Sequence, residues 1–174
     1  MTPRGNDNVR LVELGDAPYR QYRKHLVRDY AADKVRAGAW SAADAENRAA
    51  KDVDVLLPEG PATRNHFLYT VRDDALPAEV GTVWFALRDS DVGRSVWIYD
   101  IIIHETFRRQ GYASRTLDLV EHKAGELGAR SVELHVFGHN HGARTLYDKM
   151  GYNVTSITMT KPIRPEILAT LDIE

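Results

Sequence analysis

Cysteine is absent from this chain of 174 residues. The absence excludes disulfide bonds, thiolate metal ligands and a cysteine nucleophile, and it is compatible with a reducing compartment. Long hydrophobic runs are also lacking, because apolar runs such as Ile101-Ile102-Ile103 fall far short of the ~20 residues that span a bilayer. The first fifteen residues contain no apolar segment typical of a secretory signal. We therefore expect a cytoplasmic protein with no membrane partner.

Neither sign of charge dominates the chain. The sequence has 23 Lys and Arg residues against 25 Asp and Glu, a net charge of −2 at pH 7. This balance gives no reason to expect a nucleic-acid partner. The hydrophobic fraction of 43% and the charged fraction of 28% are ordinary for a globular protein. The length is typical of a single domain, which we expect to cover residues 1–174.

Hydrophobic periodicity predicts a chain of alternating helices and strands. Asp16 and Asn140 are expected to cap helices, and Gly128 and Gly151 to end them. The nearly continuous apolar stretch 96–103 predicts a strand that is covered on both faces at the centre of the sheet. The predicted strands are 9–14, 66–72, 80–87, 96–103, 132–137 and 152–160, and the predicted helices lie within 16–38, 41–58, 112–128 and 140–151.

This order of elements, with hairpins and at least one crossover in one sheet, predicts an α/β or α+β layered fold.

The stretch between Ile103 and Ser114 is the most informative one for function. A strand ends there, and a turn containing Arg108, Arg109 and Gly111 opens a long amphipathic helix. Unpaired N–H groups and the helix dipole make such a start an anion site, and a phosphate or pyrophosphate is its natural ligand. An ordinary exposed basic turn is the alternative.

Neither a GxxxxGK[ST] loop nor a full GxGxxG fingerprint is present, so nucleoside triphosphates and dinucleotides are weaker candidates. Arg108-x-x-Gly111-x-Ala113 resembles the acyl-CoA pyrophosphate loop of the GNAT superfamily of acetyltransferases. The stretch from Asn140 to Tyr152 resembles the second signature of the same superfamily, with Asn140-x-x-Ala143-x-x-Leu146-Tyr147-x-x-x-Gly151-Tyr152. The resemblance covers roughly residues 96–152 and is similar to the branch that acetylates protein N-termini. Stretches 56–63 and 134–140 also resemble uncharacterised bacterial members.

The resemblance implies a GNAT fold with helices on both faces of a mixed, mostly antiparallel sheet, whose fourth and fifth strands splay apart. It also implies acetyl-CoA as co-substrate, a primary amine as acceptor and direct transfer in a ternary complex. Dimers are common in the superfamily, so a homodimer is a candidate assembly. The implied CoA-binding residues are Ile101, Ile102, Ile103, Arg108, Arg109, Gln110, Gly111, Tyr112, Ala113, Ser114, Asn140, Ala143 and Tyr147.

Within the resemblance, Tyr147 is expected to act as the general acid that protonates the departing thiolate. Its alternative role is packing on a short helix. His135 is the first candidate for the base that deprotonates the amine, because it takes the place of a glutamate in the N-terminal acetyltransferase branch. Asp100, an acid in an apolar strand, is the second candidate. Water-mediated deprotonation is the third.

Aromatic residues near the fourth strand are candidates for the acceptor pocket. They are Trp84, Tyr99 and His66, with Trp97 as a further neighbour, and their alternative role is sheet packing.

The triplet His135, His139 and His141 is a weak metal candidate because no acidic ligand pattern accompanies it, so we expect no metal. A non-catalytic domain that binds or senses acyl-CoA is the alternative to an enzyme.

Overall fold

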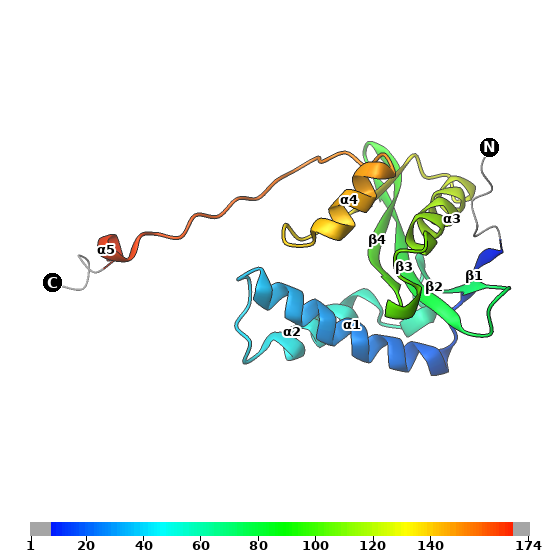
Figure 1. Ribbon diagram of the computed structural model, residues 1–174, viewed down its shortest axis with the longest axis horizontal. Coiled ribbons are helices and arrows are strands. Elements are labelled where there is room, and N and C mark those ends of the chain that lie inside the picture. Colours follow the sequence, from blue (N-terminus) through cyan, green and yellow to red (C-terminus); the bar gives the residue numbers. More distant parts are fainter. Residues whose placement is uncertain (1–7, 169–174) are drawn as a thin grey trace.

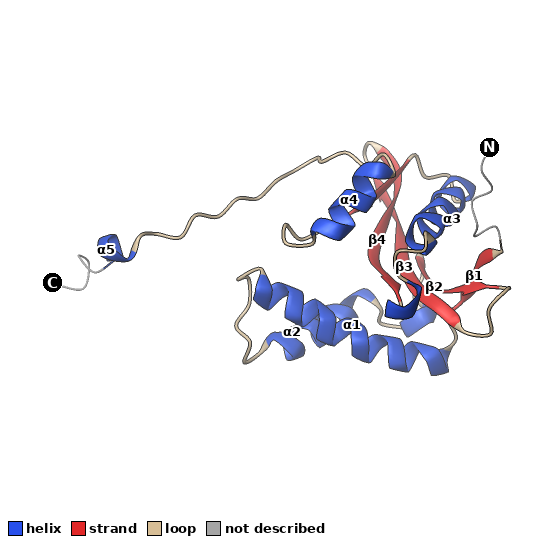
Figure 2. Ribbon diagram, viewed as in Figure 1, coloured by secondary structure: helices blue, strands red, loops and turns tan. Residues whose placement is uncertain are grey.

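The computed structural model describes residues 8–168. A five-stranded sheet with the order β1-β2-β3-β4-β5 forms its centre (Figure 2). Neighbouring strands are antiparallel, except β4 and β5, which are parallel. The mixed layered architecture expected from the sequence is confirmed. The strands are β1 (Val9–Glu13), β2 (His66–Asp73), β3 (Glu79–Ser90), β4 (Gly93–Ile103) and β5 (Ser131–Leu134).

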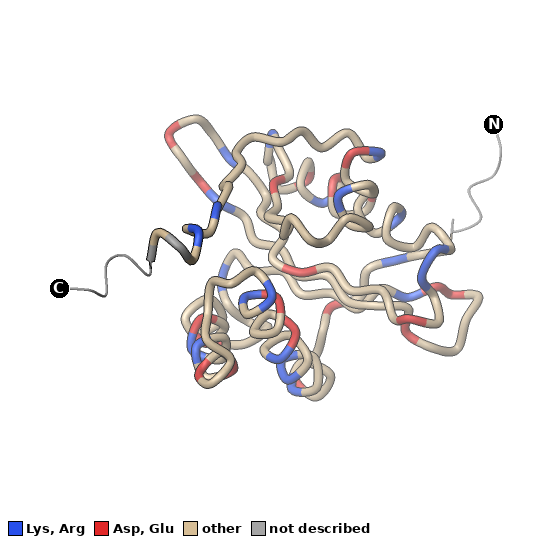
Figure 3. Tube along the Cα trace, turned by 60° about the vertical axis from the view of Figure 1, so that its left-hand side comes forward, with Lys and Arg blue, Asp and Glu red and all other residues tan. Residues whose placement is uncertain are grey.

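Helices cover both faces of the sheet (Figure 1). α1 (Asp16–Arg36) and α2 (Ala45–Leu56) pack on one face, and α3 (Tyr112–Glu126) packs on the other. α4 (His141–Lys149) follows β5, and α5 (Pro165–Leu168) lies near the end of the described chain. Figure 3 shows charges of both signs along α1 and α2, which is typical of helices with one face in solvent. No helix within residues 8–168 is long and apolar enough to cross a membrane.

The core consists of two clusters of buried side chains, one on each face of the sheet. Phe85, Val96 and Leu117 belong to the cluster between the sheet and α3. Leu26 and Trp84 belong to the cluster beneath α1 and α2. The inner strands can alternate between the two clusters because successive side chains of a strand point to opposite faces.

The predicted position of strand 96–103 at the centre of the sheet is wrong. β3 is the middle strand, and its residues from Val80 to Ala86 are all buried. Ile101 and Ile102 of β4 are only half-buried. A nearly continuous apolar run has the same appearance in a sequence whether helices cover both faces or one face borders a gap. The pattern alone therefore did not identify the central strand.

A β-bulge interrupts the pairing of β3 with β4. Trp84 lies opposite Asp100 and Phe85 lies opposite Ile98, so Tyr99 is the extra residue in β4. Pairing between β4 and β5 ends at Ile98, immediately before this bulge. Within residues 8–168, β4 therefore continues past the end of β5 without a neighbouring strand on that side, which is the splay expected for the fourth and fifth strands.

The helix starts agree with the sequence only in part. The side chain of Asn140 accepts a hydrogen bond from the Ala143 N–H at 3.1 Å, so its predicted capping role is confirmed. Asp16 is the first helical residue rather than the cap, and Gly15 occupies the cap position without a side-chain bond. Asp16 still favours the helix, because an acidic residue in the first turn complements the helix dipole.

The predicted last strand, 152–160, is wrong. β5 is also shorter than predicted, so His135 lies beyond its end. After Gly151 the chain is extended but pairs with no strand in the described part of the molecule, and it leads away from the body (Figure 1). The residue types there favour strand structure, but a strand also needs a partner to satisfy its backbone groups.

Candidate functional site

The turn before α3 has an unusual backbone that its sequence explains. A short 3-10 helix, Glu105–Phe107, follows β4, and Arg109 then adopts a positive φ of 61°. Gly111 caps α3 with a φ of 87°, a left-handed conformation that glycine adopts without steric cost. Positive φ is uncommon for a residue with a side chain, and it occurs often at functional sites.

Side chains hold this turn against the sheet. The buried hydroxyl of Tyr112 donates to Asp73 Oδ2 at 2.8 Å, which joins the first turn of α3 to the end of β2. Arg108 Nε donates to the Ile103 carbonyl at 3.0 Å, and Gln110 Nε2 donates to the Thr106 carbonyl at 2.9 Å. The start of α3 is therefore fixed from several directions.

The backbone N–H groups at the start of α3 precede its first internal hydrogen bond. That bond runs from the Arg115 N–H to the Gly111 carbonyl at 3.1 Å, and no side chain caps the helix. The N–H groups of Tyr112, Ala113 and Ser114 thus belong to the first turn, where helices leave donors without internal partners. With the exposed Arg108 and Arg109 beside it, this turn can bind a phosphate or pyrophosphate.

Asp100 lies on the part of β4 that has no β5 neighbour. The bulge at Tyr99 places Asp100 on the α1 face of the sheet, where Tyr22 Oη donates to its Oδ2 at 2.8 Å. Desolvation raises the pKa of Asp100 to about 6, although the Tyr22 hydrogen bond opposes the rise. The charges of Asp29 and Asp33 raise it further. A carboxyl group with this pKa can accept a proton near neutral pH.

The opening between this part of β4 and the chain that follows β5 is called the gap below. Tyr147 lies on α4, which follows β5 and borders the gap from the side opposite to Asp100. Desolvation raises its pKa to about 12, and the charge of Asp100 adds to the rise. The two groups are therefore within electrostatic range of each other. The Tyr147 ring lies 5.5 Å from the Tyr152 ring, between centroids. A phenol with this pKa is protonated at neutral pH and can donate a hydrogen bond.

His135 stands apart from these two groups in its surroundings. It lies after the end of β5, its side chain is exposed, and its ring packs edge-on against Phe137 at 5.1 Å. The backbone there is outside the sheet, so the register of β5 does not direct this side chain toward the gap.

The three aromatic acceptor candidates lie together on the face of the sheet that α1 and α2 cover. Trp84 and Tyr99 are stacked with centroids 4.4 Å apart, and the His66 ring lies 5.6 Å from Tyr99. Trp84 Nε1 donates to His66 Nδ1 at 3.0 Å, so this nitrogen is an acceptor. Desolvation and the charge of Arg88 lower the pKa of His66, which favours the neutral ring. Trp84 is buried, while His66 and Tyr99 are half-buried.

Arg88 connects this cluster to Trp97. Its guanidinium group lies 4.2 Å from the Trp97 ring centroid and donates to Tyr99 Oη at 2.9 Å.

No group of three or more His, Cys, Asp or Glu residues within 8–168 could hold a metal ion. His139 Nε2 instead lies 3.2 Å from Asp33 Oδ1, so this histidine contacts α1.

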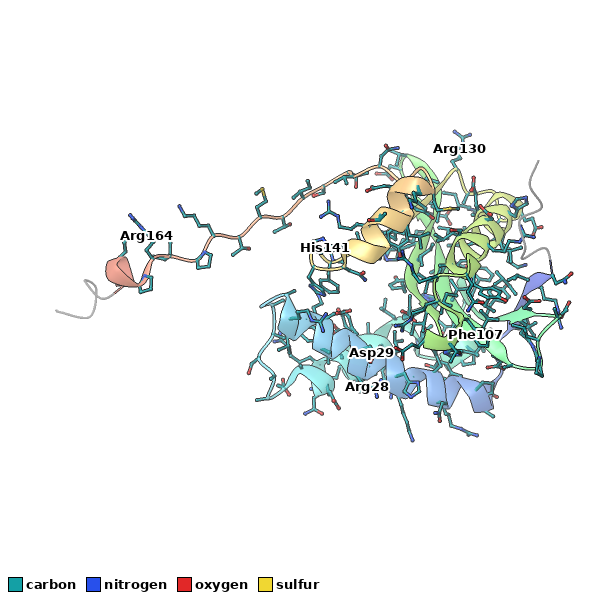
Figure 4. All side chains as sticks on the ribbon, in the orientation of Figure 1. Arg28, Asp29, Phe107, Arg130, His141 and Arg164 are labelled. Atoms are coloured by element: carbon teal, nitrogen blue, oxygen red, sulfur yellow. The ribbon has the colours of Figure 1, made fainter. Side chains whose placement is uncertain are left out.

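Sequence reasoning missed the residues of α1 that face the gap. Tyr22 was visible only as one member of an apolar helical stripe, and nothing in its spacing indicates a bond to Asp100, 78 positions away. Asp29, labelled in Figure 4, and Asp33 are the acidic residues of this helix whose charges raise the pKa of Asp100. Asp73 lies between the predicted strands 66–72 and 80–87, where the sequence does not indicate that its buried carboxylate anchors Tyr112. Each of these roles depends on contacts between distant segments.

Comparison with known proteins gives a consistent result. The model of the acetyltransferase (GNAT) family matches residues 36–152. An uncharacterized N-acetyltransferase of Bacillus subtilis, YycN, is 31% identical over 155 residues, which cover 89% of this chain and 99% of the relative. A second one from the same organism, YdgE, is 29% identical over 153 residues, with 88% of this chain and 97% of the relative covered.

Solved structures agree with the sequence matches. The crystal structure of Bacillus subtilis YycN has a TM-score of 0.85 at 31% identity, covering 90% of this chain and 99% of that chain. A GCN5-related N-acetyltransferase from Ralstonia eutropha has a TM-score of 0.64 at 18% identity, covering 89% of this chain and 98% of that chain. The second likeness shows a shared fold alone.

Proposed function

This chain belongs to the acetyltransferase (GNAT) family, and from that premise we propose that it transfers an acetyl group from acetyl-CoA to a primary amine. Both substrates would bind together, and the amine would attack the thioester directly, with no acyl-enzyme intermediate. One domain, formed by the whole chain, would carry out the reaction. The observation that carries this proposal is the coincidence of three features along β4: a free strand segment, an anion-binding helix start, and titratable groups on both sides of the gap.

In our proposal, acetyl-CoA lies along the open part of β4. Backbone groups of residues 101–103 would pair with the pantetheine arm, since β5 does not use this side of the strand. One N–H there would polarise the thioester carbonyl. The first-turn N–H groups of α3, with Arg108 and Arg109, would bind the pyrophosphate. On α4, the cap formed by Asn140 and Ala143 would fix the helix that carries Tyr147.

We propose Asp100 rather than His135 as the general base. Asp100 is half-buried, bonded to Tyr22 and within electrostatic range of Tyr147, whereas His135 is exposed beyond the end of β5. Amines with a pKa near 10.4 are mostly protonated at neutral pH, so a base must remove one proton before or during attack. A carboxylate with a pKa of about 6 is ionised above that pH and can accept the proton.

Tyr147 would stabilise the leaving sulfur. As the nitrogen–carbon bond forms and the carbon–sulfur bond breaks, negative charge develops on the sulfur, whose conjugate acid has a pKa of about 8.5. Full transfer from a phenol with a pKa of about 12 to a free thiolate is unfavourable. Tyr147 would therefore first donate a hydrogen bond, and the proton that the amine loses would balance the charge when CoA leaves as a thiol.

The acceptor amine would enter on the face of the sheet covered by α1. His66 and Tyr99 are half-buried there and offer an aromatic surface, with Trp84 packed beneath them as support. Because Trp84 donates to His66 Nδ1, the other ring nitrogen of His66 is free to carry the proton and to donate to a ligand.

The test is release of free CoA from acetyl-CoA in the presence of a panel of amines and peptides, together with calorimetric titration of CoA. We expect CoA binding and thiol release with at least one acceptor class. Binding without release across the panel would favour a non-catalytic acyl-CoA-binding domain. Absence of CoA binding would overturn both proposals.

A further inference from the structure

Hydrogen bonding fixes the position of the proton on His66 in the aromatic cluster, the group formed by His66, Trp84, Trp97 and Tyr99. Trp84 Nε1 can only donate, and it bonds to His66 Nδ1 at 3.0 Å, so Nδ1 is the acceptor nitrogen. Desolvation and the charge of Arg88 lower the pKa of His66, which favours the neutral ring. The proton of the neutral ring then lies on Nε2. His66 thus has an N–H donor that Trp84 does not use.

Tyr99 is also left with a donor. Arg88 Nη2 donates to Tyr99 Oη at 2.9 Å, and a guanidinium group cannot accept, so Tyr99 Oη is the acceptor of this bond. The hydroxyl proton of Tyr99 is therefore available for a second bond. Within residues 8–168, the side chains of His66 and Tyr99 form no further hydrogen bond. Both donors are thus available to a ligand.

Arg88 carries the positive charge of this cluster. Its guanidinium group lies 4.2 Å from the Trp97 ring centroid and 5.3 Å from the Tyr99 ring centroid, so both aromatic rings hold it. None of the ion pairs within residues 8–168 includes Arg88. Glu133, which pairs with Trp97 across the strands, accepts a hydrogen bond from Ser131 instead. The cluster therefore offers donors and a positive charge to which no carboxylate of the described residues is bonded.

Negative charge lies at the other end of the proposed acceptor region. The charges of Asp29, labelled in Figure 4, and Asp33 act on the carboxyl group of Asp100. Asp100 pairs with Trp84 across the strands, and Arg88 follows four positions later, which is about 13 Å along β3. A ligand that reaches both ends meets donors and a cation at one end and carboxylates at the other. Its own charges should be opposite in sign and several bonds apart.

We propose that the acceptor carries a carboxylate in addition to its reacting amine, and that Arg88, Tyr99 and His66 bind this carboxylate. The amine at the other end of the acceptor would then lie near Asp100. A carboxylate only accepts hydrogen bonds, and it can form two parallel bonds with one guanidinium group. A diamine would instead bring a second cation to Arg88, and like charges repel. This inference rests on the proposed acetyl transfer and names the class of its acceptor, a linear ω-amino acid.

The first experiment compares acceptors that differ in the group opposite the amine. Release of free CoA is measured with linear ω-amino acids of increasing chain length, with the ω-amino amides of the same lengths and with the corresponding diamines. We expect kcat/KM for at least one acid to exceed that for its amide by about 10-fold, because hydrogen bonds to a charged group are the stronger ones. The diamines should be poorer than the amides.

The outcomes of this comparison separate the acceptor class from the activity itself. Equal kcat/KM for acid and amide at every length, or a preference for the diamines, would overturn the carboxylate site while acetyl transfer stands. No release with any amine would overturn the proposed function, and this inference with it.

The second experiment locates the carboxylate site. Arg88→Gln removes the charge, and Tyr99→Phe removes the hydroxyl group but keeps the stacked ring. Each variant should lower kcat/KM for the preferred acid by about 10-fold and bring the acid-to-amide ratio toward one, with KM for acetyl-CoA unchanged. A general loss of packing would lower both rates and leave the ratio as it is.

The matched control is Arg130→Gln, which removes an exposed cation outside the aromatic cluster (Figure 4). This variant should keep the acid-to-amide ratio of the unchanged chain. The carboxylate site is disproved if Arg88→Gln and Tyr99→Phe both keep that ratio, or if the control loses it to the same extent.

Discussion

Residues 8–130 and residues 131–168 bury their side chains to different degrees. All the buried core residues, from Val9 to Ala124, lie in the first region. The second region has apolar residues on α4 and in the extended segment that follows it, and those whose exposure is described stay half-buried or exposed. The proposed site lies between the two regions. Asp100 belongs to the tightly packed region, and Tyr147 belongs to the region without buried residues. The side that carries Asp100 is therefore closely packed within the chain, and the side that carries Tyr147 is not.

The largest expected effect is at Asp100, on the closely packed side. We expect Asp100→Asn to lower turnover by about 10²–10⁴-fold, because the amide cannot accept the proton of the amine. Steady-state rates across pH would check this, and the acidic limb expected near pH 6 for the unchanged chain should disappear. The matched control is Asp89→Asn, which breaks an exposed ion pair with Arg94 and should leave turnover unchanged. If both variants behave alike, Asp100 is not the base.

The second prediction tests packing in the two regions directly. Phe85 is fully buried, so Phe85→Ala should lower the free energy of unfolding by about 3–5 kcal/mol. Leu146 on α4 is half-buried, and Leu146→Ala should cost about 1 kcal/mol. Denaturant unfolding of both variants, in the full chain and in a chain ending at Tyr152, provides the measurement. Equal costs in the shortened chain would remove the contrast between the regions.

The third prediction concerns Tyr147→Phe, a change on α4 in the region without buried residues. We expect turnover to fall by about 10²-fold, the lower end of the range for acid–base groups, because the raised pKa makes this phenol a weak acid. Tyr152→Phe is the control, since the pKa of Tyr152 is also raised to about 12 and its ring lies beside that of Tyr147. Single-turnover kinetics should separate the chemical step from product release. A comparable loss in the control would point to packing as the cause.

The smallest effect is expected at Tyr22. Its hydrogen bond lowers the pKa of Asp100, so Tyr22→Phe should raise that pKa and move the acidic limb of the rate profile to higher pH. At high pH the rate should be nearly unchanged, because Asp100 is ionised in both chains. Tyr30→Phe is the control, because it removes a long 3.4 Å bond from another tyrosine of α1, to Asp52 of α2 rather than to Asp100. A limb that moves downward would contradict the assigned role.

Much of the fold was predictable from local patterns. The start of α3 could be located because Gly111, the arginines before it and the apolar stripe behind it all act within a few residues. The cap by Asn140 is equally local. The hairpin of β2 and β3 followed from two strand patterns separated by turn residues.

Features that depend on distant contacts were not predictable. The central strand was misidentified because an apolar run does not reveal which neighbours cover it. The bond between Tyr22 and Asp100, and the bond between Tyr112 and Asp73, join segments that no local pattern relates. The expected final strand failed for a different reason, since strand propensity alone does not supply residues 152–160 with a partner strand.

The bulge at Tyr99 has a consequence for how such a gap could arise. With one residue fewer, side chains along β4 would alternate without interruption, and the strand would lose the bend that bulges impose. Its continuation could then run alongside the chain that follows β5, and the two would pair over a greater length. Deleting this one position should therefore lengthen the pairing between β4 and the chain that follows β5, and it should narrow the opening between them.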